Sequence, residues 1–244
     1  MSSASAKPPL QAVLDRITSS AQRAGRNTAD IELIAVSKTR AADEIRLISG
    51  QGIRSFGENY LQEALPKIEA LRDLSLCWHF IGHIQGNKTR EIASAFDWIH
   101  TVDRERIAER LCLHTPDHKI LNILVQVNVD ADPAKGGVAI EDRSGLHRLL
   151  ATIRNCPRLR LRGLMTILAV ETPPLEGYSR LKALFGECRD AGGPDWDTLS
   201  MGMSADFEQA IACGATQVRV GSALFGHRMG RSDGPGQGPG DVLP

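Results

Sequence analysis

Short apolar runs alternate with stretches in which apolar residues recur at helical spacing. Residues 31–39 form the first such run, which is rich in β-branched residues and ends abruptly in Ser37, Lys38 and Thr39. A continuous apolar run of this length is typical of a strand that is buried on both faces. The residues behind it, 41–49, place two isoleucines on one helical face and end near two glycines, so we predict a helix there.

The same pair of strand and helix recurs along the chain. Further strands are predicted at residues 53–56, 77–82, 98–102, 120–129, 161–168, 198–201 and 217–224. Helices with an apolar face are predicted behind them, at residues 61–68, 86–96, 103–113, 146–153, 175–189 and 204–213. Strands that alternate with helices favour a parallel sheet, and eight strands are the number that closes a barrel.

These elements predict an α/β fold with one domain, a (β/α)8 TIM-type barrel over residues 10–229. An extra helix starts at Leu10, ahead of the first strand. The length of 244 residues agrees with the roughly 250 that such a barrel typically needs. Residues 1–9 are rich in serine, alanine and proline, and we expect a flexible N-terminus. Residues 230–244 are rich in glycine and proline, and we expect a disordered tail.

Charge and cysteine content limit the expected binding partners and the expected cellular compartment. Twenty-nine basic and twenty-nine acidic residues cancel, so the overall charge favours neither nucleic acid nor an anionic membrane as a partner. No apolar stretch approaches the roughly 20 residues that span a bilayer, and no signal peptide is evident. The five cysteines are widely spaced and form no C-x-x-C pair, which argues against a disulfide framework or a zinc site. We therefore expect a soluble protein in the reducing cytoplasm.

Lys38 ends the first predicted strand and is the leading candidate for chemistry. In parallel α/β proteins ligands bind at the carboxyl edge of the strands, because helices cover the other surfaces. An amine in that position can form an imine with an aldehyde. The alternative is a lysine that lays its stem on apolar surface and extends its charge into water.

Polar groups at the ends of other predicted strands would converge on the same edge. Residues 200–206, with Ser200 and Ser204, combine small residues and hydroxyls where a helix is predicted to begin, which suits an anion such as phosphate. Ser204 could equally be an ordinary helix cap. Arg219 lies within an apolar strand, so it either pairs with a carboxylate or faces a ligand. Asn59 is either a ligand group or a turn residue.

His79 and His83 lie four residues apart along the third predicted strand and so would face the same side. No third ligand lies nearby in the sequence, so we expect packed histidines and no metal site.

Six stretches carry a resemblance to a known family. They are AVSKT (35–39), FGENYLQE (56–63), WHFIGHIQGNK (78–88), LRGLMTI (161–167), LSMGMSADFEQAI (199–211) and VRVGSALFG (218–226). In this order, over most of the chain, they resemble the pyridoxal phosphate homeostasis protein family. The resemblance implies a barrel like the N-terminal domain of alanine racemase, the type III fold of pyridoxal 5'-phosphate (PLP) proteins.

The same resemblance implies a set of cofactor-binding residues. PLP would form a Schiff base on Lys38, and Arg219 would face the pyridine nitrogen. Asn59 and Met165 would lie along the ring. The remaining residues of the set, around the phosphate or in the adjoining serine and methionine element, are Ser200, Met201, Ser204, Gly221 and Ser222.

Whether such a protein catalyses a reaction is a separate question. An arginine beside the pyridine nitrogen disfavours its protonation, and the unprotonated ring is a weaker electron sink. The related racemases add a tyrosine from a further domain of a partner subunit, and we expect that domain to be absent here. The two tyrosines, Tyr60 and Tyr178, are predicted on helices outside the barrel mouth.

The leading hypothesis is therefore a PLP carrier without catalytic residues, acting in intracellular PLP homeostasis and so in amino-acid metabolism. We expect a monomer that passes PLP to PLP-dependent apoenzymes. One alternative is a PLP-dependent amino-acid racemase or lyase that uses Lys38 as its base. Another is a cofactor-free Schiff-base aldolase acting on phosphosugars.

Overall fold

The computed structural model describes residues 9–226 of the chain. The expected flexible N-terminus, 1–9, lies outside this range except for Pro9, which begins the first helix. The expected disordered tail, 230–244, lies wholly outside it.

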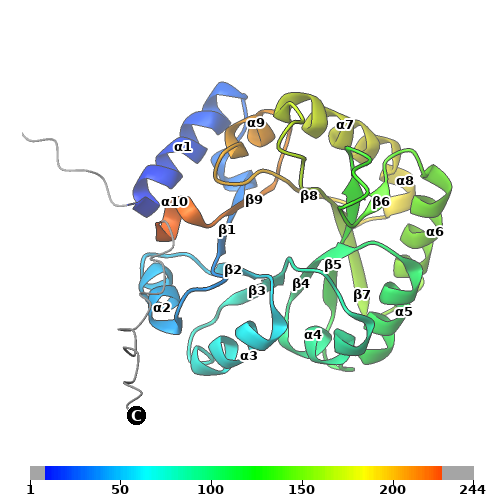
Figure 1. Cartoon of the computed structure of the whole chain (residues 1–244), viewed down its shortest axis with the longest axis horizontal. Helices are drawn as coiled ribbons and strands as arrows, with labels where there is room; N and C mark the ends of the chain where they lie inside the picture. Colours follow the sequence, from blue (N-terminus) through cyan, green and yellow to red (C-terminus); the bar gives the residue numbers. More distant parts are fainter. Residues whose placement is uncertain (1–8, 227–244) are drawn as a thin grey trace, which may run out of the picture.

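Eight parallel strands close into a barrel in the described part of the chain, as predicted, and Figure 1 looks into the ring that they form. Each strand pairs with its neighbour in sequence, β5 pairs with β4 and β7, and β9 returns to β1 and closes the ring. The strands are β1 (Glu32–Val36), β2 (Ser55–Glu58), β3 (Cys77–Phe80), β4 (Trp98–Val102), β5 (Leu121–Asn128), β7 (Leu159–Met165), β8 (Thr198–Ser200) and β9 (Gln217–Val220).

Helices surround this ring, and the expected extra helix α1 packs against α9 and α10 on the outside (Figure 1). The helices are α1 (Pro9–Arg23), α2 (Ala42–Gly50), α3 (Leu61–Ala70), α4 (Thr89–Ala95), α5 (Glu105–His114), α6 (Arg143–Arg154), α7 (Pro174–Glu187), α8 (Arg189–Gly192), α9 (Phe207–Ala212) and α10 (Ser222–Phe225), with short 3-10 helices at Thr28–Asp30 and Gly86–Lys88.

The core has two parts because side chains alternate between the faces of a strand. Ile123, Val125 and Val127 of β5 belong to the large cluster between the sheet and its helices. Leu124, between them in sequence, packs with Met165 in a small cluster on the other face, inside the barrel. Both faces are thus buried, which accounts for the uninterrupted apolar runs in the sequence.

Several predicted boundaries are wrong near the carboxyl ends of the strands. The eighth predicted strand ends at Val220, because Ser222–Phe225 forms the short helix α10. The helix predicted from residue 204 begins only at Phe207, after a turn in which the Asp206 carboxylate accepts the Met203 N–H at 2.7 Å. A two-residue strand, β6 (Val138–Ala139), pairs with β5 and was not predicted.

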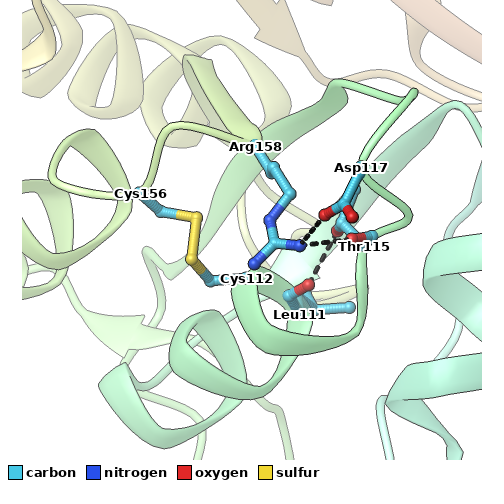
Figure 2. Close-up of a disulfide and its surroundings, with 6 residues drawn as sticks. All are labelled: Leu111, Cys112, Thr115, Asp117, Cys156 and Arg158. Atoms are coloured by element: carbon cyan, nitrogen blue, oxygen red, sulfur yellow. Dashed lines mark hydrogen bonds and ion pairs between the residues drawn. A yellow bond between two sulfur atoms is a disulfide. The ribbon is translucent and has the colours of Figure 1, made fainter.

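The prediction against disulfides is also wrong for one pair. Cys112 of α5 and Cys156, just after α6, are disulfide-bonded although 44 positions separate them in sequence (Figure 2). Neighbouring outer helices bring distant positions together, so wide spacing along the chain says little about spacing in the fold. Beside the disulfide, Arg158 donates to the Asp117 carboxylate at 2.6 Å and to the Thr115 carbonyl oxygen at 3.2 Å.

Within residues 9–226, every helix is too short or too polar to span a lipid bilayer.

Candidate functional site

A cavity of about 510 Å³ opens at the carboxyl ends of the strands. Six of the residues predicted for a cofactor site line it together: Lys38, Asn59, Ser204, Arg219, Gly221 and Ser222. They come from segments that follow or end β1, β2, β8 and β9, which are far apart in sequence. Parallel strands in a barrel bring these ends to one mouth.

The three other predicted residues lie deeper than the lining. Ser200, Met165 and Met201 are completely buried. Ser200 accepts a hydrogen bond from the guanidinium of Arg219, which lines the cavity. Met165 belongs to the small cluster inside the barrel, whereas Met201 packs in the large core.

The rest of the lining was not among the predicted cofactor-binding residues, although Met203 and Ala205 lie in the stretch 200–206 that was predicted to suit an anion. It consists of Val36, Thr39, Arg40, Ile81, Ile167, Met203, Ala205 and Gly226. Most of these residues directly follow a strand or flank a predicted site residue. Their place in the sequence next to a strand end was therefore the feature by which they could have been predicted. The apolar members carry no chemical signature by which a sequence could single them out.

Lys38 lies in a tight turn rather than in the strand itself. β1 ends at Val36, and the Arg40 N–H donates to the Ser37 carbonyl oxygen at 3.0 Å across the turn. Thr39 has a φ of 65°, a left-handed conformation that is uncommon for a β-branched residue. The turn leaves Lys38 half-buried at the edge of the cavity.

Two loops line the cavity with serine hydroxyl groups, and one of them follows β9, the strand that pairs with β1. The loop after β8 contributes Ser204, and the end of β9 contributes Gly221 and Ser222. The Ser204 hydroxyl accepts the Gly221 N–H at 3.4 Å, so Ser204 joins the two loops. Its alternative role as an ordinary helix cap does not apply, because α9 begins three residues later.

Gly202 shapes the loop after β8. Its φ of 92° is in the region that favours glycine. A Cβ atom there would lie 2.6 Å from the Cβ of Ala210 and 2.8 Å from the Cα of Phe207. The loop can therefore pack this closely against α9 only with glycine at this position.

Arg219 is a buried cation with neutral hydrogen-bond partners. Its side chain donates to the Ser200 hydroxyl at 2.7 Å and to the Thr166 carbonyl oxygen at 2.8 Å. Burial lowers the pKa of its guanidinium, an effect that the nearby Tyr178 and Asp206 oppose. Of the two alternatives for Arg219, the contacts support a side chain that faces the cavity and forms no ion pair with a described residue.

A chain of buried polar contacts runs from Arg219 into the barrel. The Arg219 guanidinium donates to the Ser200 hydroxyl, which is hydrogen-bonded to His100 Nδ1 at 2.9 Å. His100 Nε2 and His79 Nδ1 share a hydrogen bond of 2.9 Å, and His79 Nε2 lies 3.4 Å from the Cys77 sulfur.

His79 and His100, the two histidines of this hydrogen-bonded row, are neutral. Burial lowers the pKa of His79 to about 3. Burial also lowers the pKa of His100 well below its usual value, and the neighbouring His79 and Arg219 act in the same direction. The prediction of a packed histidine is thus confirmed for His79. It is wrong for His83, which is exposed because β3 ends at Phe80.

The tyrosines lie outside the cavity lining. Tyr60 is 57% exposed and immediately precedes α3. Tyr178 is buried on α7, and burial together with the nearby Asp206 raises its pKa above the usual range.

A lysine and an arginine thus share one cavity at the mouth of a (β/α)8 barrel, an arrangement that fits a known fold class. Residues 10–229 match the family model of the alanine racemase N-terminal domain. The alanine racemase of Corynebacterium glutamicum has a similar fold, with a TM-score of 0.62 and 18% identity over 90% of this chain and 62% of that chain.

Two further comparisons identify a narrower group. The pyridoxal phosphate homeostasis protein of Pseudomonas aeruginosa is 49% identical over 220 residues, which cover 88% of this chain and 93% of that protein. PipY of Synechococcus elongatus, solved with PLP bound, is 34% identical with a TM-score of 0.75, over 88% of this chain and 100% of that chain. The chain belongs to the pyridoxal phosphate homeostasis protein family.

Proposed function

We propose that this protein binds PLP in the cavity and serves intracellular PLP homeostasis. The observation that carries the proposal is the joint placement of the Lys38 amine, the Arg219 guanidinium and two serine hydroxyls on one cavity of about 510 Å³. PLP presents an aldehyde, a ring nitrogen and a phosphate, and each finds a suitable partner among these groups.

An unpaired buried atom supports the same fit. Asn59 lines the cavity, and its Oδ1 atom is buried with no hydrogen-bond partner among the described residues. A buried acceptor without a partner is costly, so it is best explained by a ligand that donates to it. The PLP ring carries a hydroxyl group that can donate in this way.

Each predicted site residue then has a role in holding the cofactor. Lys38 binds the aldehyde carbon through its amine, and Asn59 contacts the ring. Ser204, Gly221 and Ser222 surround the phosphate. The buried members of the predicted set, Met165, Ser200 and Met201, act from behind the lining, Ser200 by orienting Arg219.

The proposed role is that of a carrier rather than an enzyme. Bound PLP supplies an electrophilic aldehyde and an electron-withdrawing ring. Arg219 disfavours protonation of the ring nitrogen and so weakens the electron-withdrawing effect. Racemisation also needs an acid or base on each face of the substrate, yet neither tyrosine of the described chain lines the cavity.

A binding assay with a catalytic control tests this proposal. The visible absorbance of PLP on the protein, followed during titration, reports imine formation, and it should be saturable in the wild type and lost in Lys38→Ala. The same samples are then incubated with alanine, serine and other amino acids. We expect no turnover above that of free PLP. Turnover that requires Lys38 would instead support the racemase or lyase alternative.

We further propose that the protein is a monomer that delivers PLP to apoenzymes. Light scattering of the PLP-loaded protein should give the single-chain mass of 26.5 kDa. A PLP-dependent apoenzyme mixed with it should regain activity, whereas no gain over an equal concentration of free PLP would argue against delivery.

A further inference from the structure

Three charged side chains that the sequence analysis did not select lie behind the turn that carries Lys38. Glu58 ends β2, and Glu63 and Lys67 lie on α3. Lys67 is only 7% exposed, although lysines are almost never buried without partners.

The ammonium group of Lys67 donates hydrogen bonds to both glutamates and to the turn. Its Nζ atom lies 2.5 Å from Glu63 Oε1, 2.8 Å from Glu58 Oε1 and 2.8 Å from the Ser37 carbonyl oxygen. An ammonium group has three protons to donate, and these contacts account for all of them. The cation thus connects α3, β2 and the residue that precedes Lys38.

Glu58 binds Lys67 and Ser37 through a carboxylate whose burial is energetically unfavourable. Its carboxylate is fully buried, and Oε1 also accepts the Ser37 hydroxyl at 2.6 Å. Its other oxygen, Oε2, has no hydrogen-bond partner among residues 9–226. Burial raises the pKa of Glu58. A buried ion pair of this kind is weak evidence for stability, so another role is worth seeking.

The turn itself supplies that role. The left-handed Thr39 costs free energy that the surroundings must offset. Its N–H donates to the Glu63 carboxylate, while the Ser37 carbonyl oxygen accepts from Lys67. The main-chain groups on both sides of Lys38 are therefore held by Glu63 and Lys67.

We propose that Lys67, with Glu63, is a positioning residue that holds the turn in the conformation that directs the Lys38 amine into the cavity. The inference rests on the proposed function, because it concerns the reaction of Lys38 with an aldehyde. In that reaction the nitrogen bonds to the aldehyde carbon, and the carbonyl oxygen leaves as water. Lys67 and Glu63 touch neither reacting atom.

Two ligands that differ only in the reacting group separate positioning from general stability. PLP can form the imine, whereas pyridoxine 5'-phosphate has an alcohol in place of the aldehyde and can only bind non-covalently. In Lys67→Met we expect the apparent affinity for PLP to fall about ten-fold, the size expected for lost hydrogen bonds to a charged group. The affinity for pyridoxine 5'-phosphate should stay within about two-fold.

A second variant and a control complete the test. Glu63→Ala removes the acceptor of the Thr39 N–H from a partly exposed helix position, so it should fold and show the same selective loss. Lys88→Met breaks an ion pair with Glu91 away from the cavity, and it should bind both ligands like the wild type. If Lys67→Met does not fold, Glu63→Ala decides the matter.

The outcomes are distinguishable. Unchanged PLP affinity in the folded variants would overturn the inference. So would an equal loss for both ligands, because it would show that the ion pair only maintains the shape of the cavity. Failure of the wild type itself to form an imine with PLP would overturn the proposed function, before any variant is compared.

Discussion

Arg219 has a hydroxyl and a carbonyl oxygen as its hydrogen-bond acceptors, and its bond to Ser200 connects it to the buried histidines inside the barrel. Among residues 9–226 no carboxylate forms an ion pair with Arg219, so the guanidinium is available to an acceptor in the cavity. The sequence singled out Arg219 because a charge in an apolar run needs an explanation. It could not show the partners, since Ser200 ends β8 and Thr166 directly follows β7.

The neutral histidines predict a pH dependence of stability. The pKa of His79 is about 3 in the folded protein, against 6.5 when exposed, so below pH 6.5 the unfolded state binds more protons. The contribution of His79 to the free energy of unfolding is therefore fully present above pH 6.5. It decreases as the pH is lowered from 6.5 towards 3, by up to about 1.4 kcal/mol per pH unit for one histidine.

Urea unfolding between about pH 6 and pH 4 measures this slope. The slope should be flatter in His79→Asn than in the wild type, and the exposed His147→Asn should keep the wild-type slope. Equal slopes in all three proteins would contradict the assignment of a neutral buried His79.

Gly202 gives a second prediction at the scale of one residue. Gly202→Ala should lower the free energy of unfolding by about 2–4 kcal/mol, because the new Cβ meets Ala210 and the φ of 92° is strained for alanine. It should also weaken PLP binding by displacing Ser204. Denaturant titration and PLP titration measure the two effects.

Gly186→Ala is the matched control, since nothing lies within 4 Å of its added Cβ on helix α7. It should be neutral or stabilising. Equal stability of the two alanine variants would show that the loop after β8 does not depend on glycine.

At the scale of elements, hydrophobic periodicity located the eight barrel strands but misplaced several ends. Two of the errors lie at the carboxyl edge, where β9 gives way to α10 and Asp206 delays the start of α9. Local side-chain hydrogen bonds decide such boundaries, and apolar spacing does not record them. Glu58 and Lys67 were missed for a related reason, because a buried ion pair between β2 and α3 looks like ordinary surface charge in a sequence.

The disulfide between Cys112 of α5 and Cys156, just after α6, leads to a prediction about stability. The closed loop of about 44 residues limits the unfolded chain, so reduction should lower the free energy of unfolding by about 2–4 kcal/mol. PLP affinity should not change, because neither cysteine lines the cavity.

Denaturant titration with and without a reductant measures this effect. The double variant Cys112→Ser with Cys156→Ser is the control and should not respond to the reductant. A wild type that is equally indifferent would show that the disulfide does not form under the conditions used.

For the whole molecule, the fold class followed from counting alternating elements, because parallel strands joined by helices have few ways to close. Closure then explains the site, since the pairing of β9 with β1 brings residues as distant as Lys38 and Arg219 to one mouth. What the sequence could not supply is the depth of each residue in that mouth. Side chains of one strand alternate between its faces, so a shift of one position decides whether a side chain at a strand end lies in the lining or in the interior. Met165, which was predicted along the cofactor ring, is fully buried in the interior.

The central claim is that Lys38 holds PLP as an imine, and borohydride reduction tests it most directly. Reduction converts the imine into a stable amine, which intact mass measurement and peptide mapping then locate. We predict one phosphopyridoxyl group per chain, on Lys38. An unmodified Lys38 after incubation with excess PLP and reduction would contradict the account.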